Sequence, residues 1–412
     1  VEGDLMEAFT LVEVADKDEL PIEITSVTKV EDKNEYVLGH AEGAIAKDKA
    51  YKVYFNGAFC DVTIPNTYST SEFESQYTYN GNDLGATWTA ESTTFRVWAP
   101  TAAEVRVNLY TAGEGGESLG QVEMVADVNG TWVATVEGDL NGTYYTYSVN
   151  VQGKVAEACD PYARTTGVNG NRAMVIDLDS TDPEGWENDD YVTQDNYTDA
   201  VIWELHVRDF SIDETSGMTN KGKFLAFTEE GTTVPGTEIS TGVDYMVALG
   251  VNYVHLLPVY DINSVDEKTG GYNWGYDPKN YNVPEGSYST DPYNGAVRVN
   301  EFKQMVQSLH DNGIGVIMDV VYNHVADAGE FCFNKIVPGY FSRIHDDGSY
   351  QSNSGCGNDT ASERSMVSKY IVDSVLYWAE EYHIDGFRWD LVGLIDIDTI
   401  NAVMEAVHAV NP

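Results

Sequence analysis

Two patterns of apolar residues alternate in the second half of the chain. Short, nearly continuous apolar runs occur four times, and helix-like segments with apolar residues at every third or fourth position follow them. Continuous runs indicate strands covered on both faces, and the wider spacing indicates amphipathic helices. The predicted strands are 200–207, 251–259, 315–322 and 384–391, and the predicted helices are 240–250, 300–313, 363–382 and 396–410.

The links between these elements are unequal in length. The helix-to-strand links are very short, whereas the strand-to-helix links span roughly 208–239, 260–299 and 323–361. Long loops after the strands are typical of a TIM barrel, whose active site lies on the loop-rich face. A doubly wound sheet would place a glycine-rich phosphate turn after its first strand, and HVRDFSIDETSG (206–217) lacks that form. A barrel needs eight units, so we expect these four to be its first half and the chain to be an N-terminal fragment.

Residues 1–180 show a different pattern, with short runs rich in Thr, Val and Tyr separated by Asn, Gly and Asp. These runs predict β-strands, among them 50–55, 93–100, 104–110, 131–136 and 143–151. A Gly-Asn-Asp turn before Leu84 divides this half into two β-modules. We therefore expect modules at 1–80 and 81–180, an acidic surface linker at 181–199, and the half-barrel at 200–412.

The net charge of the chain disfavours two classes of binding partner. The net charge is −44, from 67 acidic against 23 basic residues. Nucleic acid and anionic membranes are poor partners, because binding them requires Lys and Arg. No run approaches about 18 consecutive apolar residues, so we expect no membrane insertion. The first residues, VEGDLMEAFTLVE, lack a signal-peptide pattern, and the start at Val1 suggests that the chain was processed or excised.

The four cysteines, Cys60, Cys159, Cys332 and Cys356, fit no zinc or redox spacing. Cys332 and Cys356 flank one loop and would be able to pair in an exported protein, but we expect four free thiols. The histidines show no close pairing typical of a metal site. The sequence therefore predicts no metal ligands.

The predicted fourth strand carries charge near its carboxyl end. Because alternate residues of a strand share a face, Arg388 and Asp390 point one way while Phe387 and Trp389 point the other. A neighbouring guanidinium keeps a carboxylate ionised. Such a carboxylate at the mouth of a barrel can attack C1 of a sugar as a nucleophile. A structural ion pair is the alternative, and strand position alone favours neither.

Polar residues also end the third strand, where Asp319, Asn323 and His324 would reach the same mouth. His324 can donate a hydrogen bond to a substrate hydroxyl, or it can simply cap a loop. Two carboxylates, an Arg and a His on adjacent strand ends favour a site over isolated structural roles.

The loop after the second strand contains YNWGYDP (272–278). Aromatic faces stack on the apolar faces of pyranose rings, and an acid accepts hydrogen bonds from hydroxyls. Trp274, Tyr276 and Asp277 therefore predict a sugar-binding platform, with a self-packed loop as the alternative.

These segments resemble a known family. DVVYNH (319–324) and GFRWDLVG (386–393) resemble the first two signature regions of the α-amylase clan of glycoside hydrolases. YNWGYDP resembles the signature of type I pullulanases, and SGCGNDTASER (354–364) strengthens this match. Residues 81–163, which include FRVWAP, resemble the starch-binding-type β-sandwich, family 48 of the carbohydrate-binding modules. Residues 1–80 are similar to the additional β-module of pullulanases.

The resemblance implies a multidomain fold with two N-terminal β-sandwich modules followed by the first half of a (β/α)8 TIM barrel. It implies a retaining hydrolase of glycoside hydrolase family 13 that cleaves α-1,6 links of pullulan, starch or glycogen-derived glucans. The implied partner is an α-glucan, the implied state is a monomer, and no cofactor is required, although calcium is common in the clan. An acidic protein with a polymeric substrate also favours an extracellular or cell-surface location.

By position, the resemblance makes Asp390 the nucleophile and Arg388 the group that holds it ionised. It makes His324 and Tyr276 sugar-contacting residues at the cleavage subsite. The other substrate-side or supporting positions are Trp274, Asp277, Asp319 and Asn323. Trp389 replaces the usual Phe, and we expect only a change in packing.

The general acid of the clan follows the fifth strand, which the sequence does not include. Retaining hydrolysis needs both carboxylates, about 5–5.5 Å apart, so we expect this chain alone to be inactive. Isoamylase-like debranching, glucan branching and non-catalytic α-glucan binding are the alternatives.

Overall fold

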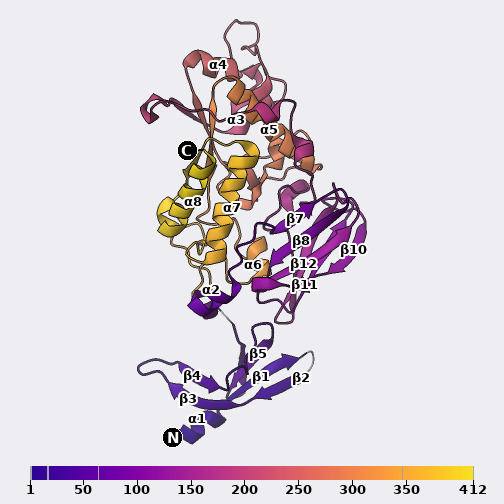
Figure 1. Cartoon of the computed structure of the whole chain (residues 1–412). Helices are drawn as coiled ribbons and strands as arrows, with labels where there is room; N and C mark the ends of the chain where they lie inside the picture. Colours follow the sequence, from indigo (N-terminus) through magenta and orange to yellow (C-terminus); the bar gives the residue numbers. More distant parts are fainter. Residues whose placement is uncertain (1, 16–17, 64, 346, 412) are drawn as a thin grey trace.

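The computed structural model of the chain describes residues 2–15, 18–63, 65–345 and 347–411. Figure 1 shows three bodies: an N-terminal β-rich module, a β-sandwich, and a unit of strands and helices that contains the C-terminus. None of the described helices is both long enough and apolar enough to cross a bilayer.

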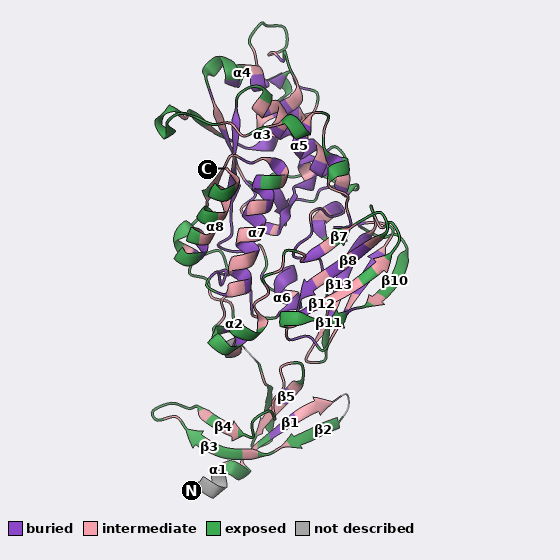
Figure 2. Cartoon of the chain, in the orientation of Figure 1, coloured by how far each residue is buried: buried purple, intermediate pink, exposed green. Residues whose placement is uncertain are grey.

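The N-terminal module contains one four-stranded antiparallel sheet in the order β2-β1-β5-β6 and a separate hairpin, β3-β4. Its elements are α1 (Glu2–Glu7), β1 (Phe9–Ala15), β2 (Asp18–Ile22), β3 (Ile24–Lys29), β4 (Tyr36–His40), β5 (Ala50–Phe55) and β6 (Ala58–Asp61). Most of this module is exposed or half-buried, as Figure 2 shows. The two packed sheets expected for residues 1–80 are therefore not shown.

The helix α2 (Ser71–Tyr77) belongs to the rest of the molecule rather than to this sheet. Thr70 caps it by accepting a hydrogen bond from the Phe73 amide, and the buried Phe73 ring packs against Trp98 and Tyr340. Across the junction, the Lys47 ammonium lies over the Phe73 ring. Phe73 of α2 therefore contacts residues on both sides, and the boundary near residue 80 stays a prediction.

The second body is a sandwich of two antiparallel sheets, ordered β11-β12-β8-β7 and β10-β9-β13-β14, with β15 paired to β13. Its strands are β7 (Gly85–Trp88), β8 (Ser92–Trp98), β9 (Glu104–Tyr110), β10 (Ser118–Glu123), β11 (Val125–Ala126), β12 (Thr131–Glu137), β13 (Tyr144–Val151), β14 (Lys154–Ala158) and β15 (Ala173–Met174). Buried residues alternate with less buried ones along β8, and the Phe95 ring contacts Tyr145 of the other sheet. The sequence predicted the longer of these strands.

The third body contains a four-stranded parallel sheet in the order β16-β17-β20-β21. Its strands are β16 (Ile202–Leu205), β17 (Tyr253–Leu256), β20 (Gly315–Val320) and β21 (Gly386–Trp389), and its longer helices are α4 (Gly242–Leu249), α5 (Gly295–Asp311), α7 (Ser365–Tyr382) and α8 (Ile397–Val410). All four predicted βα pairs are present. The helix α5 begins five residues earlier than predicted, because Asn294 caps it by accepting from the Ala296 amide.

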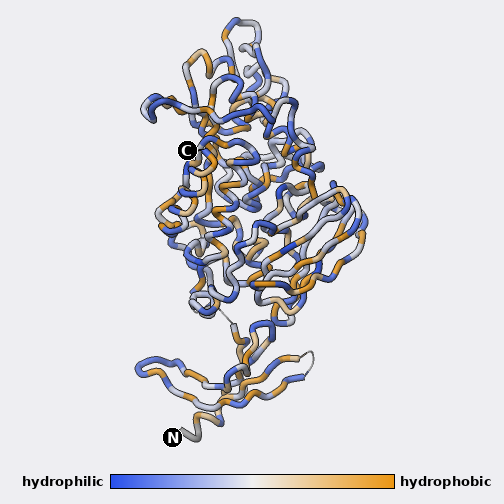
Figure 3. Tube along the Cα trace, viewed as in Figure 1, coloured by the Kyte–Doolittle hydropathy of each residue, from blue (hydrophilic) through white to orange (hydrophobic). Residues whose placement is uncertain are grey.

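The long strand-to-helix links contain structure of their own. The first begins with α3 (Val207–Ser211), the second contains the hairpin β18 (Tyr260–Ile262) and β19 (Pro278–Pro284), and the third contains α6 (Cys332–Ile336). Figure 3 shows, in the same orientation, that hydrophilic and hydrophobic residues are mixed along most of the chain. All four cysteines are free, so Cys332 and Cys356 do not form a disulfide.

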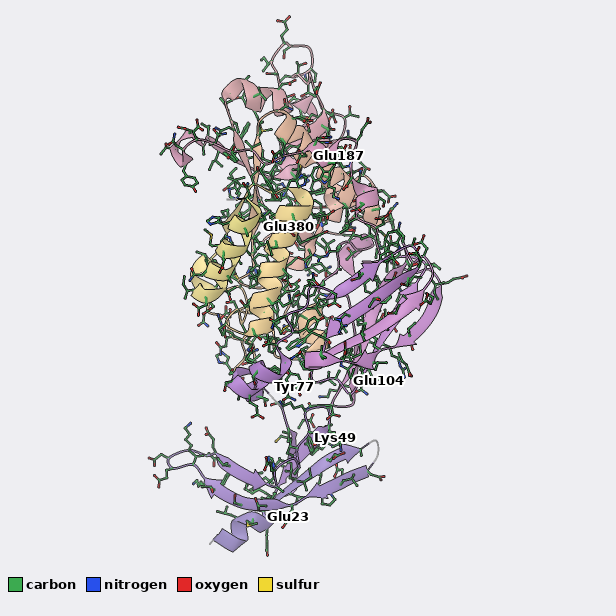
Figure 4. The ribbon with its side chains drawn as sticks, in the orientation of Figure 1. Glu23, Lys49, Tyr77, Glu104, Glu187 and Glu380 are labelled. Carbon is green, nitrogen blue, oxygen red and sulfur yellow. The ribbon has the colours of Figure 1, made fainter. Side chains whose placement is uncertain are left out.

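The acidic segment 181–199 contains only short turns, but it does not simply run over the surface. Trp186 is buried and stacks on His383, with ring centroids 4.2 Å apart and planes at 4°. The neighbouring Glu187, labelled in Figure 4, is exposed. Asp189 contacts Nδ1 of His310 at 2.9 Å and Nδ1 of His383 at 2.6 Å. These contacts fix the segment to the ends of α5 and α7.

Candidate active site

One face of the parallel sheet carries a row of polar side chains. The register aligns Glu204, His255 and Ile317 in one layer, and Asp319 with Arg388 in the next. The other face carries apolar side chains such as Val254, Val316 and Met318, which are buried. This alternation follows from the two-residue period of a strand.

Asp319 lies at the centre of the polar row and is completely buried. Its Oδ2 atom accepts a hydrogen bond from the Tyr276 hydroxyl at 2.7 Å and lies 3.1 Å from Arg388 Nη1. The same oxygen is 3.2 Å from Nε2 of His255. A buried carboxylate needs such donors, because an unpaired buried charge is costly. Burial and the bond to Asp319 raise the pKa of Tyr276, which keeps its phenol protonated.

Asp390 directly follows β21 and faces the same group. Arg388 Nη1 donates to Asp390 Oδ1 at 3.0 Å, and Asn323 Nδ2 lies 3.3 Å from the other carboxylate oxygen. Asn323 also donates to the Asp390 carbonyl at 3.0 Å. Burial opposes the charge of Arg388, but its bonds to the two carboxylates outweigh burial and raise the pKa of the guanidinium. Asp390 is therefore held by Arg388 and Asn323 while its side chain remains 18% exposed.

His324 is buried beside these residues. Its Nδ1 lies 2.6 Å from Oδ1 of Asn323, and its Nε2 lies 2.9 Å from the Tyr276 carbonyl. Burial lowers the pKa of the imidazole. Both ring nitrogens already have protein partners, so a hydrogen bond to a ligand would have to replace one of them.

The loop 272–278 does not form one continuous aromatic platform. Gly275 has φ of 95°, and a Cβ there would lie 2.9 Å from Pro258 Cβ, so the tight turn requires glycine. Tyr276 faces Asp319, whereas Trp274 is 58% exposed and donates to the Tyr272 hydroxyl. Asp277 accepts a hydrogen bond from the Ser264 amide at 2.8 Å, which ties the loop together.

Trp274 instead borders an open cleft of about 660 Å³ beside β16, which Glu204 also lines. Trp203, His206, Phe210 and Tyr245 are among the other residues that line it. The predicted site residues thus divide into two groups. Asp319, Asn323, His324, Arg388, Asp390 and Tyr276 are joined by hydrogen bonds, while Trp274 lies apart and Asp277 serves the loop.

The sequence interpretation did not single out His255 and Glu204. His255 Nδ1 lies 3.3 Å from Glu204 Oε2, and its Nε2 contacts Asp319. The signal was present, since a histidine alternates with Val254 and Leu256 within an apolar run, on the face that also carries Asp319.

Calcium is the one cation that the resemblance suggested, and three buried carboxylates, Asp261, Glu267 and Glu285, lie close together. Arg298, also completely buried, donates to both oxygens of Glu267 at 3.0 and 2.8 Å. The two Glu285 oxygens accept from backbone amides. Calcium requires six to eight oxygen ligands, and here a guanidinium already supplies the positive charge. The cluster as it stands does not fit calcium.

Two family descriptions match parts of the chain. Residues 83–163 match "Carbohydrate-binding module 48 (Isoamylase N-terminal domain)", and residues 230–339 match "Alpha amylase, catalytic domain". Among curated proteins, the pullulanase of Bacillus subtilis (strain 168) is 42% identical over 360 residues, which are 87% of this chain and 49% of that protein. Pullulanase 1, chloroplastic, of Arabidopsis thaliana is 37% identical over 80% of this chain and 38% of its own length.

Solved structures give the same relationship. The pullulanase from Anoxybacillus sp. LM18-11, crystallised with maltotetraose, has a TM-score of 0.86 and 40% identity, over 98% of this chain and 57% of that one. The pullulanase from Paenibacillus barengoltzii, in complex with maltohexaose and α-cyclodextrin, has a TM-score of 0.81 and 51% identity, over 84% and 54%. The chain spans about half the length of the relatives that it matches, or less.

Proposed function

This chain belongs to the pullulanase-type members of the α-amylase family of glycoside hydrolases, and we propose that its site cleaves α-1,6-glucosidic links. The substrates are pullulan and branched glucans derived from starch or glycogen. The observation that carries this proposal is the Arg388–Asp390 ion pair at the carboxyl end of β21, joined through Asp319 and Asn323 to Tyr276 and His324.

In this proposal Asp390 is the nucleophile. One of its oxygens attacks C1 of the sugar while the α-1,6 bond to the leaving glucose breaks, which gives a glycosyl ester. Water then attacks C1 and releases Asp390 as a carboxylate, so the anomeric configuration is retained. Arg388 and Asn323 orient the carboxylate, as their hydrogen bonds to its two oxygens support.

The substrate-side roles go to Tyr276 and His324. With its hydroxyl committed to Asp319, Tyr276 can offer only its ring face to a pyranose. Exchange of the His324 hydrogen bond from the Tyr276 carbonyl to a sugar hydroxyl would link substrate binding to the position of this loop. Trp274, which is exposed on the loop that carries Tyr276, would contact sugars further from the cleaved bond.

We also propose that the four βα units are half of a closed (β/α)8 barrel. Among the described residues, β16 and β21 each pair on one side only, and the relatives are about twice as long. A general acid from the other half would protonate the leaving oxygen. The sandwich that matches carbohydrate-binding module 48 would add affinity for the glucan.

The test replaces Asp390 by Asn in the natural protein that carries this sequence, with pullulan as substrate. The expected result is a loss of kcat of at least about a thousandfold, with maltotriose affinity nearly unchanged. The control Asp398→Asn removes an exposed carboxylate in the first turn of α8 and should retain full activity. Asparagine at 390 with a near-normal rate would remove that residue from the nucleophile role. Cleavage of pullulan by the wild type separates this proposal from glucan branching and from simple glucan binding.

A further inference from the structure

A continuous chain of charged and polar side chains crosses all four parallel strands, with one contributor on each strand. Glu204 on β16 lies 3.3 Å from His255 on β17, which lies 3.2 Å from Asp319 on β20. Asp319 is 3.1 Å from Arg388 on β21, and Arg388 is 3.0 Å from Asp390. The proposed nucleophile is thus the last member of a chain that begins three strands away.

The partners of His255 limit its hydrogen-bonding role. Its Nε2 faces a carboxylate oxygen of Asp319, which can only accept a hydrogen bond, so Nε2 carries a proton and donates. Its Nδ1 faces a carboxylate oxygen of Glu204, which again can only accept. Both ring nitrogens of His255 therefore face carboxylate oxygens. The Tyr276 hydroxyl donates to the same Asp319 oxygen, whereas the Tyr253 hydroxyl, two residues before His255, donates to the Val192 carbonyl.

The contact between His255 and Asp319 matters because Asp319 and Asp390 share one donor group of Arg388. Nη1 of Arg388 alone serves both oxygens of Asp319 and one oxygen of Asp390. Asp319 is fully buried, so its charge must be neutralised by its neighbours. Without His255, the donors to Asp319 in this row would be Arg388 and Tyr276. We would then expect Arg388 to move toward Asp319 and away from Asp390.

Packing by itself does not require a charged pair at this level of the sheet. Ile317 occupies the same register layer as Glu204 and His255, which shows that an aliphatic side chain fits there. The His255 side chain is 11% exposed, and replacing a buried polar group of this kind by an apolar one is often neutral for stability, whereas the Glu204 side chain is 63% exposed and fills no core space. The contact of His255 with Asp319 therefore explains Glu204 and His255 better than packing does.

We propose that His255, held in place by Glu204, is a positioning residue for the cleavage reaction: it donates a hydrogen bond to Asp319 and so leaves Arg388 available to Asp390. The expected effect on catalysis rests on the proposed function, whereas the expected effect on the position of Arg388 does not.

The kinetic test uses His255→Leu, His255→Gln and Glu204→Gln in the natural protein that carries this sequence, with pullulan as substrate. Leucine removes the donor, whereas glutamine keeps an N–H group at a similar position. We expect His255→Leu to lower kcat roughly ten- to a hundredfold with KM changed less than about threefold, and His255→Gln to restore part of the loss. Glu204→Gln should have a smaller effect in the same direction. The matched control is Tyr253→Phe, on the same strand and face, which should stay within about twofold of wild type.

The structural test is a crystal structure of the His255→Leu and His255→Gln variants of this chain. We expect the Arg388 Nη1 to Asp390 Oδ1 contact to lengthen beyond hydrogen-bonding distance with leucine and to remain near 3.0 Å with glutamine. If His255→Leu does not fold, the glutamine variant and Glu204→Gln still provide the kinetic comparison. An unmoved Arg388 in the leucine variant, or a leucine variant as active as wild type, overturns the proposal. If the wild type does not cleave pullulan, the proposed function fails, while the position of Arg388 still decides this inference.

Discussion

Arg298 is a buried cation of α5. It joins the region of β19 and α5 to the loops of the sandwich. Its guanidinium donates to both oxygens of Glu267, to the carbonyls of Pro292 at 3.0 Å and Pro284 at 3.3 Å, and to Thr166 on the sandwich side at 3.4 Å. Neither Arg298 nor Glu267 has any exposed side-chain surface. The substitution Arg298→Met keeps the volume and removes the charge and all these donors.

The expected loss of stability follows from the buried carboxylates that Arg298→Met leaves without a cation. Glu267 would lose its partner while Asp261 and Glu285, both buried, remain close to it. Breaking a buried ion pair by removing one member costs about 3–5 kcal/mol. For units of this size, each kcal/mol lowers the melting temperature by about 2–4 °C, which gives a fall of roughly 6–20 °C.

The assay is scanning calorimetry at neutral pH on the wild type and three variants. The control Arg343→Met breaks an ion pair with Glu363, whose side chains are 22% and 47% exposed, and should cost no more than about 1 kcal/mol. The double variant Arg298→Met, Glu267→Met removes both charges and should recover much of the loss. An Arg298→Met variant that melts within about 2 °C of wild type, or a double variant no better than the single one, would refute the reasoning.

Three further predictions concern pH and activity. Burial and the neighbouring Glu267 raise the pKa of Asp261 to about 7 and of Glu285 to about 8, so their contribution to stability is full below about pH 4 and is lost as pH rises through about 8. Between about pH 5 and pH 9, the melting temperature of the Asp261→Asn variant should therefore decrease less with rising pH than that of the wild type. An equal decrease in the two proteins would contradict this. Burial opposes the charge of His310, but the bonds to Asp189 and Asp385 outweigh it and raise its pKa to about 9, so its contribution is full below about pH 6.5 and is lost through about pH 9. His310→Gln should accordingly lower the melting temperature more at about pH 6 than at about pH 10, and the reverse order would be inconsistent with a charged His310. We also expect the 412-residue chain by itself to release no maltotriose from pullulan, and chromatographic detection of maltotriose would contradict this expectation.

The regular part of the fold was readable from the sequence because its periodicity is strong. The helix predicted at 363–382 is α7 at Ser365–Tyr382, and the strand predicted at 315–322 contains β20 at Gly315–Val320. In both cases the apolar residues that define the period are the ones buried against the core. The face assignment of Arg388 opposite Trp389 follows from the same two-residue period.

The irregular parts were not readable, because long-range contacts determine them. Trp186 and Asp189 lie in an acidic segment with no periodicity, and contacts to the distant His310 and His383 fix them. Likewise, nothing local in YNWGYDP shows that Tyr276 turns toward Asp319 while Trp274 turns outward. That division depends on the turn at Gly275 against Pro258.

The most direct measurement of the central claim is to identify the covalent intermediate. The natural protein that carries this sequence would be treated with a fluorinated maltotriosyl fluoride, which forms the glycosyl ester faster than water removes it, and then digested for mass spectrometry. If Asp390 is the nucleophile, the digest contains one maltotriosyl adduct, on the carboxylate of Asp390. An adduct on another residue, or turnover with no adduct at all, would contradict it.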